Sequence, residues 1–289
     1  SRQLVADLLA QLDLEVLEDR LFRGSSRDIG GKSVFGGQVA GQALVAATRT
    51  VDPGQLAHSL HGYFLRPGDM AKPIVYEVDA IRDGRSFATR RVQAIQHGRP
   101  IFSMLASFHV AETGYTHQMD MPDVPGPEEL ASHDELRHAW IDELDRVPDS
   151  LKEAVGREIA IDMRPVEPWN LLAPDKRAPA QYVWFRAKDA VPKDQAVHRA
   201  VLTYASDFNL LTTSQMPHGV SFFTPGMQMA SIDHALWFHG DLEVDDWLLY
   251  CMDSPGAQDS RGLSRGLIFA RDGRLVASVA QEGLIRQRD

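Results

Sequence analysis

The chain has 289 residues, of which 44% are hydrophobic and 24% are charged, the proportions of a globular protein. Its net charge of -10 argues against nucleic-acid binding, which usually needs a basic surface. The single cysteine, Cys251, excludes an internal disulfide framework, and no apolar stretch is long enough to cross a membrane. We therefore expect a soluble, cytoplasmic protein with no membrane insertion and no nucleic-acid partner.

The first half of the chain predicts helices followed by a series of strands. Leucines at nearly helical spacing predict an amphipathic helix over residues 3–18. Gly36 and Gly37 precede a second helix, at 38–48, whose many alanines allow a sheet to wrap closely around it. Alternating patterns then predict four strands, at 58–66, 73–82, 86–97 and 99–110. The His97-Gly98 pair suits a hairpin turn, because glycine adopts positive φ without strain.

The second half predicts the same order of elements. A strand at 182–186 precedes a helix at 197–215, whose apolar residues form one stripe from Val197 to Leu211. Strands are then predicted at 227–238, 246–253, 260–271 and 274–286, with a hairpin turn at Asp272-Gly273.

The region between the halves is rich in proline and carries an acidic helical stretch near 128–156. We expect a surface connection there with short helices and a mobile loop within 115–135.

The two halves also match residue by residue at an offset of about 173 to 175 positions. The corresponding pairs are His61 and His234, Ile74 and Trp247, Gly98 and Gly273, and Ser103 and Ser278. Such a repeat predicts two similar packed units, at 1–112 and 181–289, joined by the connection 113–180.

The differences between the copies point to candidate functional residues. Ser231 stands where the first copy has His58, and Gln281 stands where it has Ala106. On its strand, Gln281 is the one polar side chain of an otherwise apolar face. A buried amide without a partner costs roughly 1–3 kcal/mol, so Gln281 should be hydrogen-bonded. Asp207 falls at the edge of the buried face of the helix at 197–215, where a carboxylate is partly removed from water.

A carboxylate, a hydroxyl and an amide suit the addition of water to an activated acyl group. The carboxylate accepts or orients a proton of the water, the hydroxyl holds its oxygen, and the amide fixes the geometry. The amides at the Gly36-Gly37 helix start are a natural place for the developing oxyanion. On these residues alone, structural roles stay open: a local partner for Gln281, and a solvated or capping position for Asp207.

Longer strings of residues resemble one enzyme family. The second half contains Tyr204-Ala205-Ser206-Asp207-Phe208, Ser231-Ile232-Asp233-His234-Ala235-Leu236-Trp237-Phe238-His239 and Val276-Ala277-Ser278-Val279-Ala280-Gln281-Glu282-Gly283. The first half contains Phe35-Gly36-Gly37-Gln38 and His58-Ser59-Leu60-His61-Gly62-Tyr63-Phe64-Leu65-Arg66-Pro67-Gly68. These strings resemble the type II acyl-CoA thioesterases (the TesB-like family) over nearly the whole chain, and most weakly across 115–180.

The resemblance implies an α+β double hot-dog fold, in which two antiparallel sheets each wrap around a central helix. It also implies hydrolysis of fatty acyl-CoA to fatty acid and CoA by an Asp, Thr or Ser, Gln triad. In this chain those roles fall on Asp207, Ser231 and Gln281, all in the C-terminal unit, with Ser231 where other members carry threonine. Gly36, Gly37 and His58 are the candidate oxyanion or substrate-binding residues.

The sequence is also compatible with two other functions. One is an acyl-CoA-binding sensor without turnover, and the other is a hot-dog enoyl-CoA hydratase, which typically needs an Asp/His pair. The helix at 197–215 offers His198 for such a pair, but well away from Asp207.

We expect no metal or other cofactor, because the strand histidines do not form a spaced set of ligands. The long sheet edges of hot-dog units favour a homodimer or homotetramer.

Overall fold

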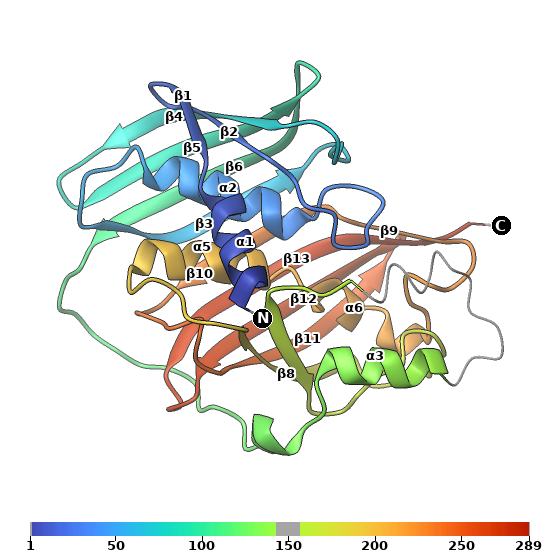
Figure 1. Cartoon of the computed structure of the whole chain (residues 1–289). Helices are drawn as coiled ribbons and strands as arrows, with labels where there is room; N and C mark the ends of the chain where they lie inside the picture. The colour runs from blue at the N-terminus through green and yellow to red at the C-terminus, as the bar shows by residue number, and fades with distance from the viewer. Residues whose placement is uncertain (1, 143–156, 289) are drawn as a thin grey trace.

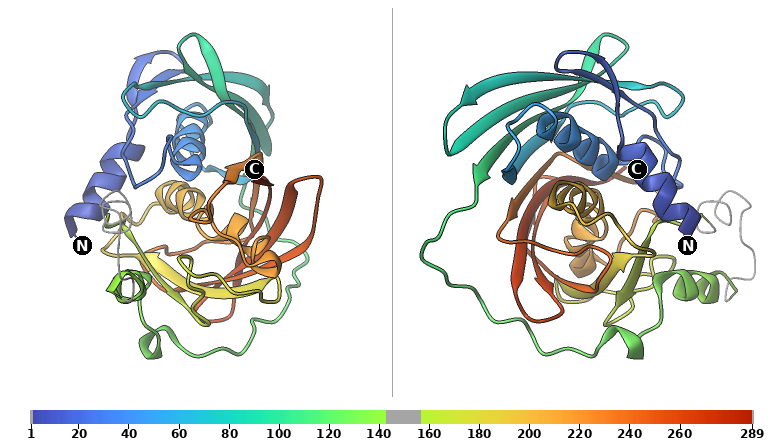
Figure 2. Two further views of the ribbon diagram at one scale, coloured as in Figure 1. Left: turned by 90° about the vertical axis from the view of Figure 1, so that its right-hand side faces the viewer. Right: turned by 60° about the vertical axis from the view of Figure 1, so that its left-hand side comes forward.

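The computed structural model describes residues 2–142 and 157–288 (Figure 1). Its centre is formed by two helices, α2 (Gly36–Thr48) and α5 (Gln195–Ala205), which pack against each other. Curved sheet segments enclose this pair from opposite sides (Figure 2). This arrangement confirms the predicted α+β double hot-dog fold.

In each half, most of the strands follow the central helix. Those of the first half are β1 (Glu15–Glu18), β2 (Leu21–Gly24), β3 (Gln55–Phe64), β4 (Ile74–Asp83), β5 (Phe87–Gln96) and β6 (Arg99–Val110). Those of the second half are β7 (Ile161–Pro165), β8 (Ala180–Ala187), β9 (Met227–Ser231), β10 (Asp233–Phe238), β11 (Leu248–Gln258), β12 (Arg261–Ala270) and β13 (Leu275–Gln287). Strands β3 to β6 and β11 to β13 correspond to long strands that the sequence predicted, whereas the predicted strand at 227–238 is divided at Ile232 into β9 and β10.

All these strands belong to one antiparallel sheet, in the order β1-β2-β4-β5-β6-β3-β10-β13-β12-β11-β8-β7, with β9 also paired to β13. The two halves join where β3 pairs with β10, from Ser59 opposite Trp237 to Tyr63 opposite Asp233. The predicted hairpin turns are present, because His97 and Gly98 both have positive φ and Gly273 has a φ of 91°.

Small residues set the distance between the central helices. Ala40, Ala43 and Ala47 of α2 are fully buried. A Cβ on Gly41 would lie 3.2 Å from the carbonyl oxygen of Ala200 on α5, so even one extra carbon would press the helices apart. Close helix packing therefore accounts for the alanines and glycines of α2 that the sequence associated with a tightly wrapped sheet.

The first predicted helix is shorter than expected. Helix α1 (Arg2–Leu12) ends at Leu12, and Glu15–Glu18 form β1 instead. Val5, Leu8 and Leu12 lie on one helical stripe and are buried, whereas Leu14 would point to the opposite side of a continued helix. Leu14 is nevertheless buried, so the chain changes conformation to bury it.

The predicted helix at 197–215 is interrupted, and the prediction of one helix was wrong. α5 ends at Ala205, and a short helix, α6 (Leu210–Thr213), begins after Asn209. Asn209 has a φ of 64°, in the left-handed region that asparagine tolerates better than most residues. Apolar periodicity continues across this break because Leu210 and Leu211 remain buried, so the pattern alone did not reveal it.

The region between the halves contains both predicted and unpredicted elements. A 3₁₀ turn, η1 (Pro127–Glu129), and α3 (His133–Asp142) are present, while 143–156 of the predicted helical stretch lies outside the described residues. Strand β7 was not predicted and extends the sheet beside β8.

The Gln118 side chain bonds to the Gly273 carbonyl and the Leu275 amide, which attaches the connection to the β12–β13 hairpin. The mobility of the loop and the limits of the three regions stay predictions. None of the described helices has the length and apolar character to traverse a bilayer.

Substitutions at Asn209 test the conformation of the helix break. Asn209→Gly should change the free energy of unfolding by no more than about 1 kcal/mol, because glycine adopts positive φ freely. Asn209→Val should lower it by roughly 1–3 kcal/mol, because a branched side chain is strained there. Urea denaturation of the purified variants measures both. Equal stability of the valine variant and the wild type would contradict the left-handed conformation.

Candidate active site

Asp207 lies in the break between α5 and α6, with its side chain only 6% exposed. One carboxylate oxygen, Oδ2, accepts a hydrogen bond of 2.8 Å from the backbone N–H of Gly37. The other, Oδ1, accepts a bond of 2.6 Å from Nε2 of Gln281 on β13. Asp207 therefore contacts both the helix of the first half and the last strand of the second half.

The contact with Gly37 places Asp207 at the N-terminus of α2. The N-cap residue Phe35 offers no side-chain hydrogen bond, so the first amides of this helix need other acceptors. Asp207 supplies one from 170 residues away in the sequence. A carboxylate is favourable at this position because the helix dipole is positive there.

Glycine is required at both positions of this helix start. A Cβ on Gly36 would lie 2.8 Å from Oδ2 of Asp207. A Cβ on Gly37 would lie 2.3 Å from the backbone oxygen of Tyr204. The Gly-Gly pair that the sequence singled out thus lets α2 approach the carboxylate and α5 closely.

Gln281 is buried at 1% exposure and has the partner that its position demanded. Its Nε2 donates to Asp207 and lies 3.1 Å from Nδ1 of His234 on β10. Its Oε1 is buried and has no hydrogen-bond partner among the described residues. Since a buried acceptor without a partner is costly, Oε1 is a candidate acceptor for a water molecule or a ligand.

Ser231 ends strand β9 and lies opposite Gly283 of β13. Gly283 is two residues beyond Gln281, so Ser231 and Gln281 are on the same face of the sheet. A Cβ on Gly283 would meet the side chain of Leu211, which shows that this face is turned toward α6. Ser231 is partly exposed, and its hydroxyl makes no hydrogen bond with Asp207 or Gln281.

His58 makes its contacts with other residues than those around Asp207. Its Nε2 lies 2.7 Å from the Ser107 hydroxyl, and its ring packs edge-on against Phe87 and His109. Burial lowers the pKa of His58, and the nearby charges of His109 and Arg199 lower it further. The structure brings together Asp207, Gln281 and Gly37, and it does not bring His58 to them.

His234 was not predicted as a site residue; in the sequence it stood out only as the repeat partner of His61 and as one of several strand histidines. His234 is 1% exposed, and its Nδ1 lies 4.0 Å from Oδ1 of Asp207. Burial lowers the pKa of His234, while the charges of Asp207 and Asp233 oppose that shift. Tyr250 is a second missed neighbour, and burial raises its pKa well above the usual value. In the sequence, only its position three residues after Ser231 indicated that His234 could lie near the site.

Cys251 has no part in this site. It lies on β11, and burial raises the pKa of its thiol to about 12, so it stays protonated at neutral pH.

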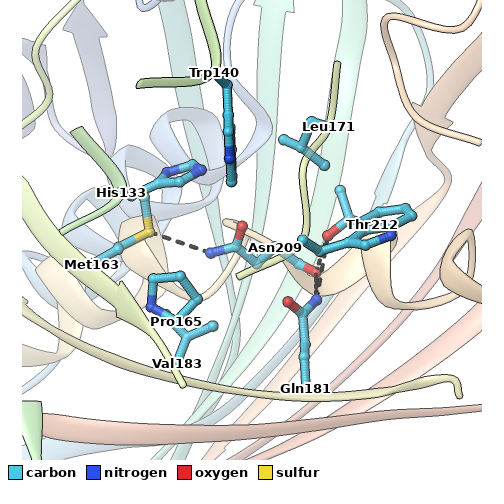
Figure 3. Close-up of a pocket in the computed structure, with 10 residues that line it drawn as sticks. His133, Trp140, Met163, Pro165, Leu171, Gln181, Val183, Asn209 and Thr212 are labelled. Atoms are coloured by element: carbon cyan, nitrogen blue, oxygen red, sulfur yellow. Dashed lines mark hydrogen bonds between the residues drawn. The ribbon is translucent and has the colours of Figure 1, made fainter. Parts of the chain in front are cut away.

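A separate pocket adjoins the helix break at Asn209. It is lined by His133, Trp140, Met163, Pro165, Trp169, Leu171, Gln181, Val183, Asn209 and Thr212 (Figure 3). Asn209 donates to the sulfur of Met163, and its carbonyl accepts from Gln181. Burial, together with the charge of Arg137, lowers the pKa of His133 to about 4, so this imidazole is neutral. The pocket includes none of Asp207, Ser231 and Gln281.

Comparisons with known proteins agree with this architecture. A solved structure with a hot-dog fold from Alicyclobacillus acidocaldarius aligns with a TM-score of 0.76 at 18% identity, covering 98% of this chain and 99% of that one. The acyl-CoA thioesterase II TesB2 of Mycobacterium marinum aligns with a TM-score of 0.79 at 44% identity, covering 98% and 99%. The fold is therefore that of the hot-dog thioesterases.

Sequence comparison identifies the family. The family model described as acyl-CoA thioesterase matches residues 152–284, and the acyl-CoA thioesterase N-terminal domain matches 24–109. Acyl-CoA thioesterase 2 of Haemophilus influenzae is 39% identical, over 97% of this chain and 97% of its own length. Human acyl-coenzyme A thioesterase 8 is 40% identical, over 95% of this chain and 87% of its own length. The chain belongs to the acyl-CoA thioesterase family.

Alanine substitutions of glycine test the close contact at the start of α2. Gly37→Ala should lower the free energy of unfolding by about 1–3 kcal/mol, because its Cβ meets the backbone of α5. Gly240→Ala is the matched control, since a Cβ there meets nothing within 4 Å, and it should stay within about 0.5 kcal/mol of the wild type. Chemical denaturation compares them, and equal stability of the two variants would disprove the contact.

Proposed function

We propose that this chain hydrolyses the thioester of fatty acyl-CoA by direct attack of a water molecule held by Asp207, Ser231 and Gln281. The observation that carries the proposal is the arrangement around Asp207, a nearly buried carboxylate bonded to Gln281 and to the first turn of α2. The named relatives are acyl-CoA thioesterases, which supports both the reaction and the acyl-CoA substrate.

Asp207 takes the role of general base. A carboxylate has more lone pairs than the two that Gly37 and Gln281 occupy, so it can accept a proton from water at the same time. The water oxygen then adds to the carbonyl carbon of the thioester, and its proton moves to Asp207. The C–S bond breaks next, and the CoA thiolate leaves and takes up the proton held by Asp207, which restores the carboxylate.

Gln281 and Ser231 position the water. The free Oε1 of Gln281 accepts one of its protons, and the Ser231 hydroxyl donates to its oxygen. Both side chains face the helix side of the sheet, as this role requires.

The backbone amide of Gly36 stabilises the oxyanion. The amide of Gly37 is already bonded to Asp207, whereas the amide of Gly36 has no protein partner among the described residues. It adjoins the carboxylate and belongs to the positive end of α2, where a developing negative charge is stabilised.

The hydratase alternative lacks a suitable histidine. His198 is fully buried: its Nδ1 accepts a hydrogen bond of 3.1 Å from the amide of Val244, and its Nε2 is enclosed without a partner among the described residues, out of reach of a substrate. His234 is closer to Asp207, but both of its ring nitrogens are hydrogen-bonded within the protein. A proton donor for an acyl double bond needs a ring nitrogen free to reach it.

The cytoplasmic location and the homodimer or homotetramer remain part of the proposal. The sheet edges at β1 and β7 are the ends of the strand order and would be available to a second copy of the chain.

Asp207→Asn tests the general base. The amide keeps the shape of the side chain but cannot take the proton, so the rate of CoA release should fall by about 10²- to 10⁴-fold. A thiol-reactive dye measures that release from acyl-CoA, and Asp253→Asn, in an exposed ion pair with Arg265, is the matched control. Wild-type turnover of Asp207→Asn would refute the mechanism. Acyl-CoA binding without thiol release by the wild type would indicate a sensor, and loss of enoyl-CoA absorbance would indicate a hydratase.

Ser231 offers a paired test of the hydroxyl. Ser231→Thr keeps the hydroxyl and should retain most of the kcat, in agreement with the threonine expected in other members. Ser231→Ala removes it and should lower kcat by roughly tenfold or more, because the water loses one of its fixed contacts. Steady-state kinetics of both variants decide the point. Equal kcat values for Ser231→Ala and Ser231→Thr would show that the Ser231 hydroxyl does not hold the water.

A further inference from the structure

His234 is connected to the catalytic amide through a chain of hydrogen bonds that determines which ring nitrogen carries the proton. The Ser206 hydroxyl donates to the carbonyl of Thr203 at 3.0 Å, so its single proton is used. Nε2 of His234 lies 2.8 Å from the same hydroxyl and must therefore donate to it. Nδ1 is left with a lone pair, which accepts from Nε2 of Gln281.

We propose that His234 is a positioning residue, whose Nδ1 fixes the side-chain amide of Gln281 with its nitrogen toward Asp207 and its oxygen free for the reacting water. The inference rests on the proposed function, because it gives the free Oε1 of Gln281 its role in holding that water.

Two acceptors make the orientation of the amide unambiguous. One proton of the Gln281 amide goes to Asp207 and the other goes to His234. The reversed amide would turn its oxygen toward the carboxylate and toward the lone pair of Nδ1, and both contacts would be repulsive. With Asp207 as the only acceptor, the amide would keep one anchor and could rotate about it.

The residues around His234 keep its imidazole neutral and fixed in place. His234 is enclosed at 1% exposure, and burial favours its neutral form. The Tyr250 hydroxyl donates to the carbonyl of Ser206 at 2.9 Å. This bond fixes the residue whose hydroxyl accepts the hydrogen bond from His234. Because both ring nitrogens are occupied, His234 acts on the reaction only through Gln281.

Two substitutions of similar polarity separate this role from a purely structural one. In His234→Asn the amide oxygen takes the place of Nδ1 and still accepts from Gln281, so most of the kcat should remain. In His234→Gln the polar group takes the place of Nε2 and the acceptor is lost. kcat should then fall by about tenfold or more with KM unchanged, since misplacing a reacting group costs up to about 100-fold.

Both variants are measured in the full chain with acyl-CoA, and thermal denaturation reports their stability. Equal kcat values for the two variants at matched stability would overturn the proposal. If His234→Gln does not fold, Ser206→Ala is the second variant: it keeps the imidazole but removes the acceptor of its proton, and it should lower kcat in the same direction. An unchanged kcat of Ser206→Ala would overturn the proposal equally.

A double-mutant cycle with Gln281→Ala completes the test. Once Gln281 is removed, His234→Gln should cause no further loss of kcat, because the amide that it positions is absent. Independent, multiplicative losses would show that His234 acts in another way. A wild-type kcat of Gln281→Ala alone would instead refute the proposed function, so the two failures are distinguishable.

Discussion

The carboxylate of Asp207 links the two halves of this chain beside the central helices, because one oxygen accepts from the first turn of α2 and the other from a side chain of β13. A carboxylate at a helix N-terminus gains about 0.3–1 kcal/mol at the surface, and up to about 2 kcal/mol when partly buried. The same contact brings Asp207, the proposed base, close to Gly36, so in the proposed mechanism fold and chemistry depend on one interaction. In the proposed mechanism the first half also contributes, because Gly36 of α2 takes the oxyanion role, whereas Asp207, Ser231 and Gln281 all belong to the second half.

Around this carboxylate the molecule uses neutral polar groups to fix each orientation. Ser206, His234 and Gln281 form a chain in which every proton has a defined acceptor. Such a chain is stable in a buried place because its members are satisfied, apart from the Gln281 oxygen. Because Oε1 of Gln281 is the acceptor without a partner, this network is a candidate site for holding a water molecule.

Much of this arrangement could be predicted from the sequence, and the reasons for the rest are physical. Two-residue alternation placed Gln281 on an apolar face, and the cost of an unpaired amide predicted its partner. The break at Ser206–Asn209 was hidden, because Leu210 and Leu211 continue the apolar stripe beyond α5. His234 was missed because a histidine on a strand looks the same in sequence whether it packs or orients a neighbour. Its role depends on β10 and β13 lying side by side.

A crystal structure with a non-hydrolysable ketone analogue of acyl-CoA, in which a methylene separates the sulfur from the carbonyl, tests the central claim most directly. The account predicts that the carbon corresponding to the thioester carbonyl lies beside Asp207, with a water between them in contact with Gln281 and Ser231. Any oxygen standing for the carbonyl should lie about 3 Å from the amide of Gly36. An analogue whose reacting carbon is instead bound in the pocket around Trp140 and Met163, away from Asp207, would contradict it.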